Sequence, residues 1–159
     1  MRKKQGRDKR DATKAKVKAP HRRNIPKGNT AIERAKRRKQ IKNALKPLQG
    51  KYVRSNESGD KIKITKDGIS ETAYHASKRY TSTLAAMDAP RQLRTAKKQR
   101  VDNADQTKTQ VKRMRLIKKQ ISQSKHDGAK TKVVIGIQAS GDKRLYCITS
   151  KRKSPKKKR

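Results

Sequence analysis

The sequence predicts a small α+β domain flanked by disordered basic arms, with one N-terminal strand, then helices, then a three-stranded antiparallel sheet. Residues 61–65 alternate apolar and polar, residues 132–137 are rich in β-branched side chains, and helical patterns lie between them. The chain has 49 Lys and Arg against 12 Asp and Glu. Leu, Ile, Val and Phe form only about 14% of it, below the roughly 20% at which high net charge predicts disorder. We therefore do not expect one packed globule.

The positive charge is densest at the two ends of the chain. Residues 1–50 contain 19 Lys and Arg against three acidic residues, and residues 151–159 contain seven against none. Such runs repel themselves and have nothing to bury. The predicted units are a basic disordered arm, a basic helix, an α+β domain and a basic tail, at residues 1–29, 30–50, 51–150 and 151–159.

Composition also limits the partners and the compartment. Basic arms need an anionic partner, and the phosphate backbone of RNA or DNA is the expected one because each bound Lys or Arg releases counterions. A membrane surface is not expected, because no aromatic or Leu cluster accompanies the charge, and no apolar run is long enough to span a bilayer. The start of the chain lacks the apolar stretch of a secretory signal. A single cysteine, Cys147, excludes an internal disulfide and favours a cytoplasmic location.

The first predicted helix begins at a capping box, with Thr30 as N-cap and Glu33 three residues later. Pro47 and Gly50 end it. Its narrow apolar stripe is bordered by Arg and Lys side chains. Two interpretations stay open, because the helix can lie along phosphates or can pack its stripe on the domain while its charges face water. The first makes three of its arginines candidate nucleic-acid ligands: Arg34, Arg37 and Arg38.

The next elements follow from turn residues and periodicity. The strand at 61–65 is bounded by turn-forming sequences on both sides. Residues 70–80 favour a helix, Thr81 or Ser82 can cap a second helix, and Pro90 permits a third helix to start. Residues 97–110 are polar and are expected to form a loop.

The C-terminal part of the domain contains the clearest hairpin. The strands at 132–137 and 145–149 are joined by a turn at 140–142. Residues 111–121 fit a helical stripe and a strand alternation equally well, so periodicity leaves this segment open. The expected core consists of apolar residues of these elements: Ile62, Ile64, Ile69, Leu84, Val133, Ile135, Ile137, Leu145 and Ile148.

No motif for a phosphate-binding loop, a dinucleotide or zinc is present, so neither a metal nor another cofactor is predicted. Of the three histidines, His21 lies in the basic arm and His126 in a turn. His75 has Glu71 at i−4, on the same face of a helix, and is followed by Lys78 and Arg79. A histidine can move the proton of a ribose 2′-hydroxyl, and nearby cations can stabilise charge on phosphate. The alternative is a partly buried surface histidine.

The segment from Lys61 to Ser150 resembles a polyvalent-protein-associated nuclease domain of phages and conjugative elements. That domain belongs to the barnase–EndoU–colicin–RelE-like superfamily. The resemblance starts with a strand followed by the pattern G-I-x-x-T-x-x-H and a Ser-rich helix start. Residues that match are Gly68, Ile69, Thr72, His75, Thr81, Ser82 and Leu84, and the segments 111–122, 127–128, 132–137 and 141–146 resemble its three closing strands.

The resemblance implies that His75 is a general acid or base, and that a polar residue of the last strand, Thr149 or Tyr146, is its partner. It also implies that 111–121 is a strand. Residues 91–100 depart from the family because they are polar where its members have an apolar helix, which puts the packing of that helix in doubt. The basic arms lie outside the resemblance.

Three functions therefore compete. The first is a metal-independent, toxin-like ribonuclease of a mobile element, located in a bacterial cytoplasm or associated with a phage, with an acidic inhibitor protein as a further expected partner. The second is a non-enzymatic nucleic-acid-binding or packaging protein. The third is a protein whose basic runs, such as 151–159, are targeting signals. Besides the three arginines of the first helix, the predicted nucleic-acid ligands are Lys78, Arg79, Arg113, Arg115, Lys151, Arg152 and Lys153.

Overall fold

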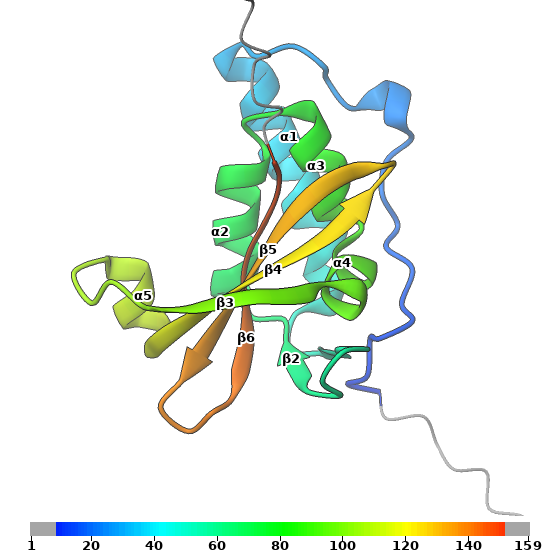
Figure 1. Cartoon of the computed structure of the whole chain (residues 1–159). Coiled ribbons are helices and arrows are strands. Elements are labelled where there is room, and N and C mark those ends of the chain that lie inside the picture. The colour runs from blue at the N-terminus through cyan, green and yellow to red at the C-terminus, as the bar shows by residue number, and fades with distance from the viewer. Residues whose placement is uncertain (1–8, 152–159) are drawn as a thin grey trace, which may run out of the picture.

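A six-stranded mixed sheet in the order β1-β2-β6-β5-β4-β3 forms the frame of the computed structural model, which describes residues 9–151 (Figure 1). Neighbouring strands are antiparallel except β2 and β6, which are parallel. The strands are β1 (Tyr52–Arg54), β2 (Lys61–Lys63), β3 (Lys97–Asn103), β4 (Leu116–His126), β5 (Ala129–Gln138) and β6 (Lys143–Ser150).

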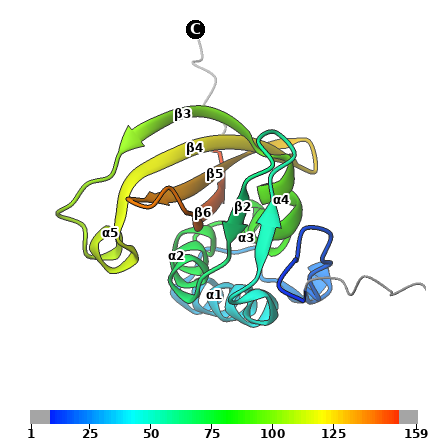
Figure 2. The same cartoon turned by 90° about the horizontal axis from the view of Figure 1, so that it is seen from below.

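Four of the helices form a layer beside the sheet, and α5 lies apart at the end where β4 begins (Figure 2). α2 and α3 pack on β6, and α1 packs on both of these helices. The helices are α1 (Ala31–Leu45), α2 (Lys66–Ala76), α3 (Tyr80–Met87), α4 (Ala89–Thr95) and α5 (Thr109–Met114), with 3₁₀ turns at Arg22–Asn24 and Lys46–Leu48. In the described part of the chain, no helix has the length and apolar character needed to cross a bilayer.

The two faces of the sheet carry two hydrophobic clusters. On β5, Val133 and Ile135 belong to the main core beneath the helices, whereas Val134 between them belongs to a smaller cluster. This split follows from the alternation of side chains along a strand. Seven of the nine predicted core residues are buried, and Leu84 and Ile137 are half-buried. The smaller cluster consists of Ala104, Val111, Met114, Leu116, Val134, Tyr146 and Cys147.

Gly68 lets α2 approach β6 closely. A Cβ atom at this position would collide with the main-chain carbonyl of Leu145 on β6. Main chain in a paired strand cannot move aside as the end of a flexible side chain can. A glycine inside a helix normally lowers its stability, but here it permits the contact that docks the helix on the sheet.

We predict that Gly68→Ala lowers the free energy of unfolding by about 1–3 kcal/mol, although alanine favours a helix, because overpacking against main chain outweighs the gain in propensity. Urea unfolding followed by circular dichroism measures the change. The comparison variant is Gly136→Ala, whose new Cβ would meet side-chain atoms of the buried Leu116 and not main chain. A Gly68→Ala protein at least as stable as wild type would contradict this account of α2 docking.

The predicted fold class is wrong in its sheet, which has six strands rather than one strand and a separate antiparallel set of three. Two of the strands have little side-chain signature. β3 is an edge strand whose side chains are all exposed, so its residues lack the alternation that reveals a half-buried strand. β1 has only three residues. The polar segment expected as a loop at 97–110 therefore contains β3, which pairs with β4 through the main chain.

The segment 111–121 contains both structures that its pattern allowed. α5 covers its start and β4 its remainder, and Arg115 in the left-handed conformation, with φ of 57°, connects them. Val111 and Met114, which have helical spacing in the sequence, both lie on α5 and are buried. The strand implied by the resemblance begins only at Leu116 because the helix must first end.

The predicted disordered arm is partly an ordered segment. Residues 9–29 run along the helices: the Ala12 amide donates to the Tyr52 carbonyl at 2.7 Å, and Ala12 and Ile25 are buried in the main core. Small or apolar side chains recur at alternate positions here, so an extended segment can bury one edge while its lysines face water. Residues 1–8 and 152–159, with the predicted ligands Arg152 and Lys153, lie outside the described residues.

Candidate functional site

Helix α2 presents Glu71 and His75 at the edge of its buried face. Thr65 caps the helix by accepting a hydrogen bond from the Gly68 amide at 3.1 Å. The buried positions Ile69, Thr72, Ala73 and Ala76 follow the i, i+3, i+4, i+7 spacing of a helix that packs on one side. Glu71 and His75 are four residues apart on the neighbouring stripe, so their side chains meet.

The imidazole of His75 is oriented by the Glu71 carboxylate. His75 Nε2 lies 2.8 Å from Glu71 Oε1, and the two side chains are 39% and 17% exposed. A carboxylate only accepts hydrogen bonds, so it selects the tautomer that has the proton on Nε2. Nδ1 is then the nitrogen with a free lone pair. A half-exposed imidazole held in one orientation by a carboxylate is suited to proton transfer.

A basic groove of about 540 Å³ opens beside this histidine. Its lining comes from five places: the segment before α1, α1, the end of α2, the turn between α2 and α3, and the end of β6. The lining residues are Asn29, Arg34, His75, Lys78, Arg79 and Thr149. Three of the six are cations and none is an acid, so the groove favours an anionic group near the imidazole.

Hydroxyl groups attach the end of β6 to α3 and so place Thr149 in the groove. Ser82 Oγ lies 2.8 Å from Ser150 Oγ and accepts from the Ser150 amide at 2.9 Å. Thr81 Oγ1 is 3.0 Å from Ser150 Oγ. The Arg79 guanidinium donates to the Ser150 carbonyl. The Ser-rich helix start noted in the sequence thus contacts the last strand rather than the groove.

Arg37 is a structural residue and not a phosphate ligand. Its side chain is fully buried, with Nε donating to the Ser77 carbonyl at 2.9 Å and Nη1 to the Pro26 carbonyl at 3.0 Å. It also donates to the Gly28 carbonyl and, at 3.2 Å, to Asn29 Oδ1. Of the three arginines predicted on the first helix, this one therefore cannot reach a nucleic acid in this conformation. It joins the segment before α1 to the end of α2, which are two walls of the groove.

Of the two proposed partners of His75, the structure brings Thr149 to the groove and leaves Tyr146 outside its lining. Tyr146 is 7% exposed, and the Lys119 ammonium lies 4.0 Å from its ring centroid. Burial raises the pKa of Tyr146 to about 12 and that of the Cys147 thiol to about 12. Both groups are therefore protonated at neutral pH, and neither can act as a base there.

The remaining predicted ligands are spread over the surface. The Arg38 guanidinium lies 5.2 Å and the Lys78 ammonium 4.8 Å from the ring centroid of Tyr74, an exposed aromatic next to His75. Lys151 donates to Gln123 Oε1 at 2.8 Å. Arg113 and Arg115 are exposed and line a separate cavity beside α5.

The sequence already indicated Glu71 through its i, i+4 spacing to His75, a local signal, but gave it no place among the site residues. Asn29 and Lys119 were missed, since Asn29 reaches the groove only through the packing of α1, and Lys119 lies on β4 beside Tyr146 of β6. Burial is the main cause that lowers the pKa of the Lys119 ammonium.

Within residues 9–151, no group of three or more His, Cys, Asp or Glu side chains is placed to hold a metal ion. His126 lies apart from His75, where its Nδ1 is 3.3 Å from Asp88 Oδ2. His21 accepts from the Arg23 amide at 3.3 Å.

Comparison with protein families finds a match over most of this chain. The model of the family described as large polyvalent protein-associated domain 3 matches residues 32–146. The matched region includes α1, the helix that carries His75, and most of the sheet, and it ends just before Thr149. No curated protein and no solved structure matches the chain.

Proposed function

We propose that this chain, which belongs to the large polyvalent protein-associated domain 3 family, is a nucleic-acid-binding protein that cleaves RNA without a metal ion. The observation that carries the proposal is the groove in which a carboxylate-oriented His75 faces Arg34, Lys78, Arg79 and Thr149. The nuclease superfamily of the resemblance supports the same reaction. The net charge of +37 supports a polyanionic substrate.

The proposed reaction is a transesterification within the RNA strand. His75 Nδ1 takes the proton of the ribose 2′-hydroxyl while the 2′-oxygen forms a bond to phosphorus. The bond from phosphorus to the 5′-oxygen breaks, that oxygen takes up a proton from water, and the imidazolium returns its proton to water. The products are a 2′,3′-cyclic phosphate and a free 5′-hydroxyl. No oxidant, reductant or metal is needed, and the base catalysis requires only a group with a pKa near the working pH.

The cations of the groove have a distinct role in this reaction. Charge develops on the non-bridging oxygens of the phosphate, and preorganised donors stabilise it best in a site of low polarity. Lys78 and Arg34 supply ammonium and guanidinium donors at the groove, and Thr149 supplies a hydroxyl that can donate or accept. Glu71 is a positioning residue, because it contacts the imidazole and does not line the groove.

The test is cleavage of a labelled RNA strand by the full chain in excess EDTA, with the same strand in deoxy form as the matched control. We expect RNA cleavage that leaves a 2′,3′-cyclic phosphate, and no cleavage of the deoxy strand, because it lacks the nucleophile. Intact RNA after prolonged incubation, or products with a 3′-hydroxyl, would contradict the proposal.

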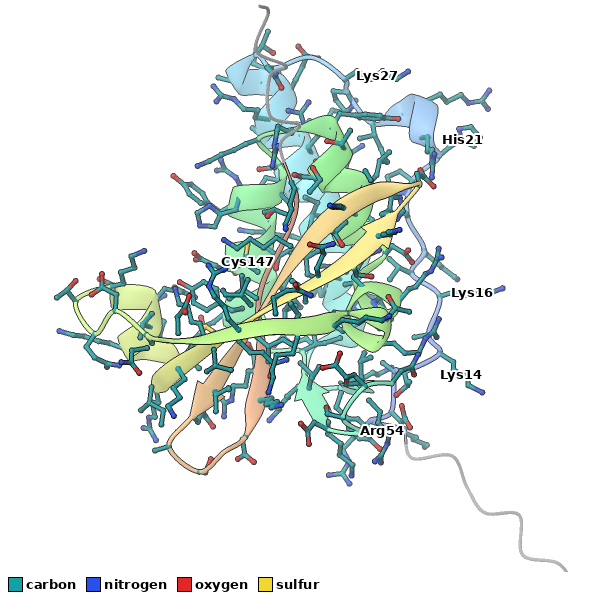
Figure 3. All side chains as sticks on the ribbon, in the orientation of Figure 1. Lys14, Lys16, His21, Lys27, Arg54 and Cys147 are labelled. Atoms are coloured by element: carbon teal, nitrogen blue, oxygen red, sulfur yellow. The ribbon has the colours of Figure 1, made fainter. Side chains whose placement is uncertain are left out.

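Non-enzymatic binding is the second candidate, and the N-terminal segment favours it. The side chains of Lys14 and Lys16 point away from the body of the protein (Figure 3). Neither lysine lines the His75 groove, and both suit binding of a phosphate backbone without chemistry. This candidate predicts salt-dependent binding of RNA and DNA alike, with both left uncut.

A further inference from the structure

Three arginine side chains meet in a cavity beside α5. Arg113 and Arg115 come from the end of this helix, and Arg144 from the start of β6. With Gln138 at the end of β5 and with Ala139 and Ser140 of the turn that follows, they line a cavity of about 450 Å³. α5 and this turn lie at the same end of the sheet (Figures 1 and 2). The volume is in the range of small-ligand sites.

Among the described residues, no acid takes part in this cavity, although Asp142 and Arg144 together line the adjoining one. Within residues 9–151, no salt bridge to a carboxylate is formed by any of the three guanidinium groups. No acidic side chain lines the cavity. Asp142, in the adjoining turn, accepts a hydrogen bond from Ser140 Oγ at 3.0 Å. Three like charges around one cavity repel one another, and a bound anion would remove this cost.

Arg115 adds backbone strain at the same place. It occupies the end of α5 with φ of 57°, where glycine or asparagine is preferred because other side chains crowd the main chain. Gln138 Nε2 donates to the Met114 carbonyl at 3.0 Å and holds the helix end against the turn. Within the described part of the chain, the guanidinium of Arg115 makes no hydrogen bond that would offset the free energy of this strain. Strain of this kind persists at binding sites, where a ligand uses the side chain.

We propose that Arg113, Arg115 and Arg144 form a second phosphate-binding pocket, which holds a backbone phosphate of a nucleic-acid strand whose other part enters the His75 groove. The choice of ligand rests on the proposed function. A guanidinium fork matches the oxygens of a phosphate. Arg144 and Thr149 are five residues apart on β6, about 17 Å at the rise of a strand. A stacked strand with about 3.4 Å per nucleotide covers this length in about five nucleotides.

The test measures binding of deoxy strands, which the full chain is not expected to cleave, by fluorescence anisotropy at one fixed salt concentration. Strands of about three and about twelve nucleotides are compared, because only the longer one spans the distance from the groove to the pocket. The variants are Arg113→Gln, Arg115→Gly and Arg144→Gln. The matched control is Arg91→Gln, which removes an equal charge from a side chain that is 60% exposed and lies on α4.

We expect each pocket variant to raise the dissociation constant of the long strand about tenfold and to change that of the short strand by less than about twofold. The effect on the long strand should be larger than the effect of Arg91→Gln. Arg115→Gly is also expected to raise the melting temperature of the free protein by about 2–4 °C, because glycine relieves the strain. Pocket variants that weaken binding no more than Arg91→Gln, or that affect both strand lengths equally, would overturn the proposal.

Lys78→Gln separates this proposal from the proposed function. It removes a charge from the His75 groove and should weaken binding of both strand lengths. If the pocket variants weaken binding of the long strand while Lys78→Gln does not change binding, the second phosphate pocket is supported and the proposed function of the groove is contradicted. If only Lys78→Gln weakens binding, the groove is supported and the second phosphate pocket is overturned.

Discussion

His75→Gln is expected to lower the rate of RNA cleavage by about 10²–10⁴-fold, the usual contribution of a general base or acid. Glutamine keeps the polarity and approximate size of the side chain but cannot exchange a proton near neutral pH. The neutral substitution leaves the cations of the groove in place, so the dissociation constant for RNA should change by less than about threefold. Single-turnover cleavage and anisotropy measure the two effects separately.

The matched control for this variant is His21→Gln, because His21 is exposed and lies on the N-terminal segment outside the groove. It should cleave like wild type. Glu71→Gln should give an intermediate loss of the cleavage rate with an unchanged dissociation constant for RNA, since Glu71 acts through the orientation of the imidazole. Full activity of His75→Gln, or loss of binding with loss of cleavage, would remove His75 from the proposed role.

Arg37→Ala is expected to lower the free energy of unfolding by about 3–5 kcal/mol, because it removes several hydrogen bonds made by a charged donor and leaves a cavity where a fully buried side chain was. The substitution leaves the buried Ser77 carbonyl, the half-buried Pro26 and Gly28 carbonyls and the Asn29 side chain without their donor, and it opens a cavity among α1, α2 and the preceding segment. Urea unfolding measures the loss. The same variant should also weaken cleavage, because the two walls of the groove that Arg37 connects would separate.

Lys36→Ala is the control for Arg37→Ala. It removes a cation from the same helix at an exposed position, where substitutions usually change stability by less than about 0.5 kcal/mol. If Arg37→Ala were as stable as Lys36→Ala, the buried network would contribute nothing, and Arg37 would return to the set of candidate phosphate ligands.

Arg37 also shows why residue type alone misleads in a basic protein. In the sequence, Arg34, Arg37 and Arg38 are equally good candidates for phosphate ligands, since all three lie in one helical segment rich in cations. The structure places the first in the groove, buries the second and sets the third over an aromatic ring. The difference depends on which side of α1 faces the rest of the fold, and the narrow apolar stripe of this helix does not decide it.

The sheet shows a related limit. Residues 132–137 and 145–149 were recognisable because buried strands are rich in β-branched residues and a Gly-Asp turn joins them. β3 pairs through main-chain hydrogen bonds along a polar, exposed segment, and such pairing has no signature in residue type. The expected sheet was therefore correct in its central hairpin and wrong in its extent.

Taken alone, the sequence established what depends on residues close together in the chain: the capped helix from Thr30, the β5–β6 hairpin, the excess of cations and the pairing of Glu71 with His75 one helical turn apart. Only the tertiary structure decided that Thr149, Arg34 and Asn29 lie beside His75, that Tyr146 does not, and that three arginines share a cavity beside α5. The physical reason is that contacts distant in sequence are set by how whole helices and strands pack, and many packings are compatible with the same local patterns.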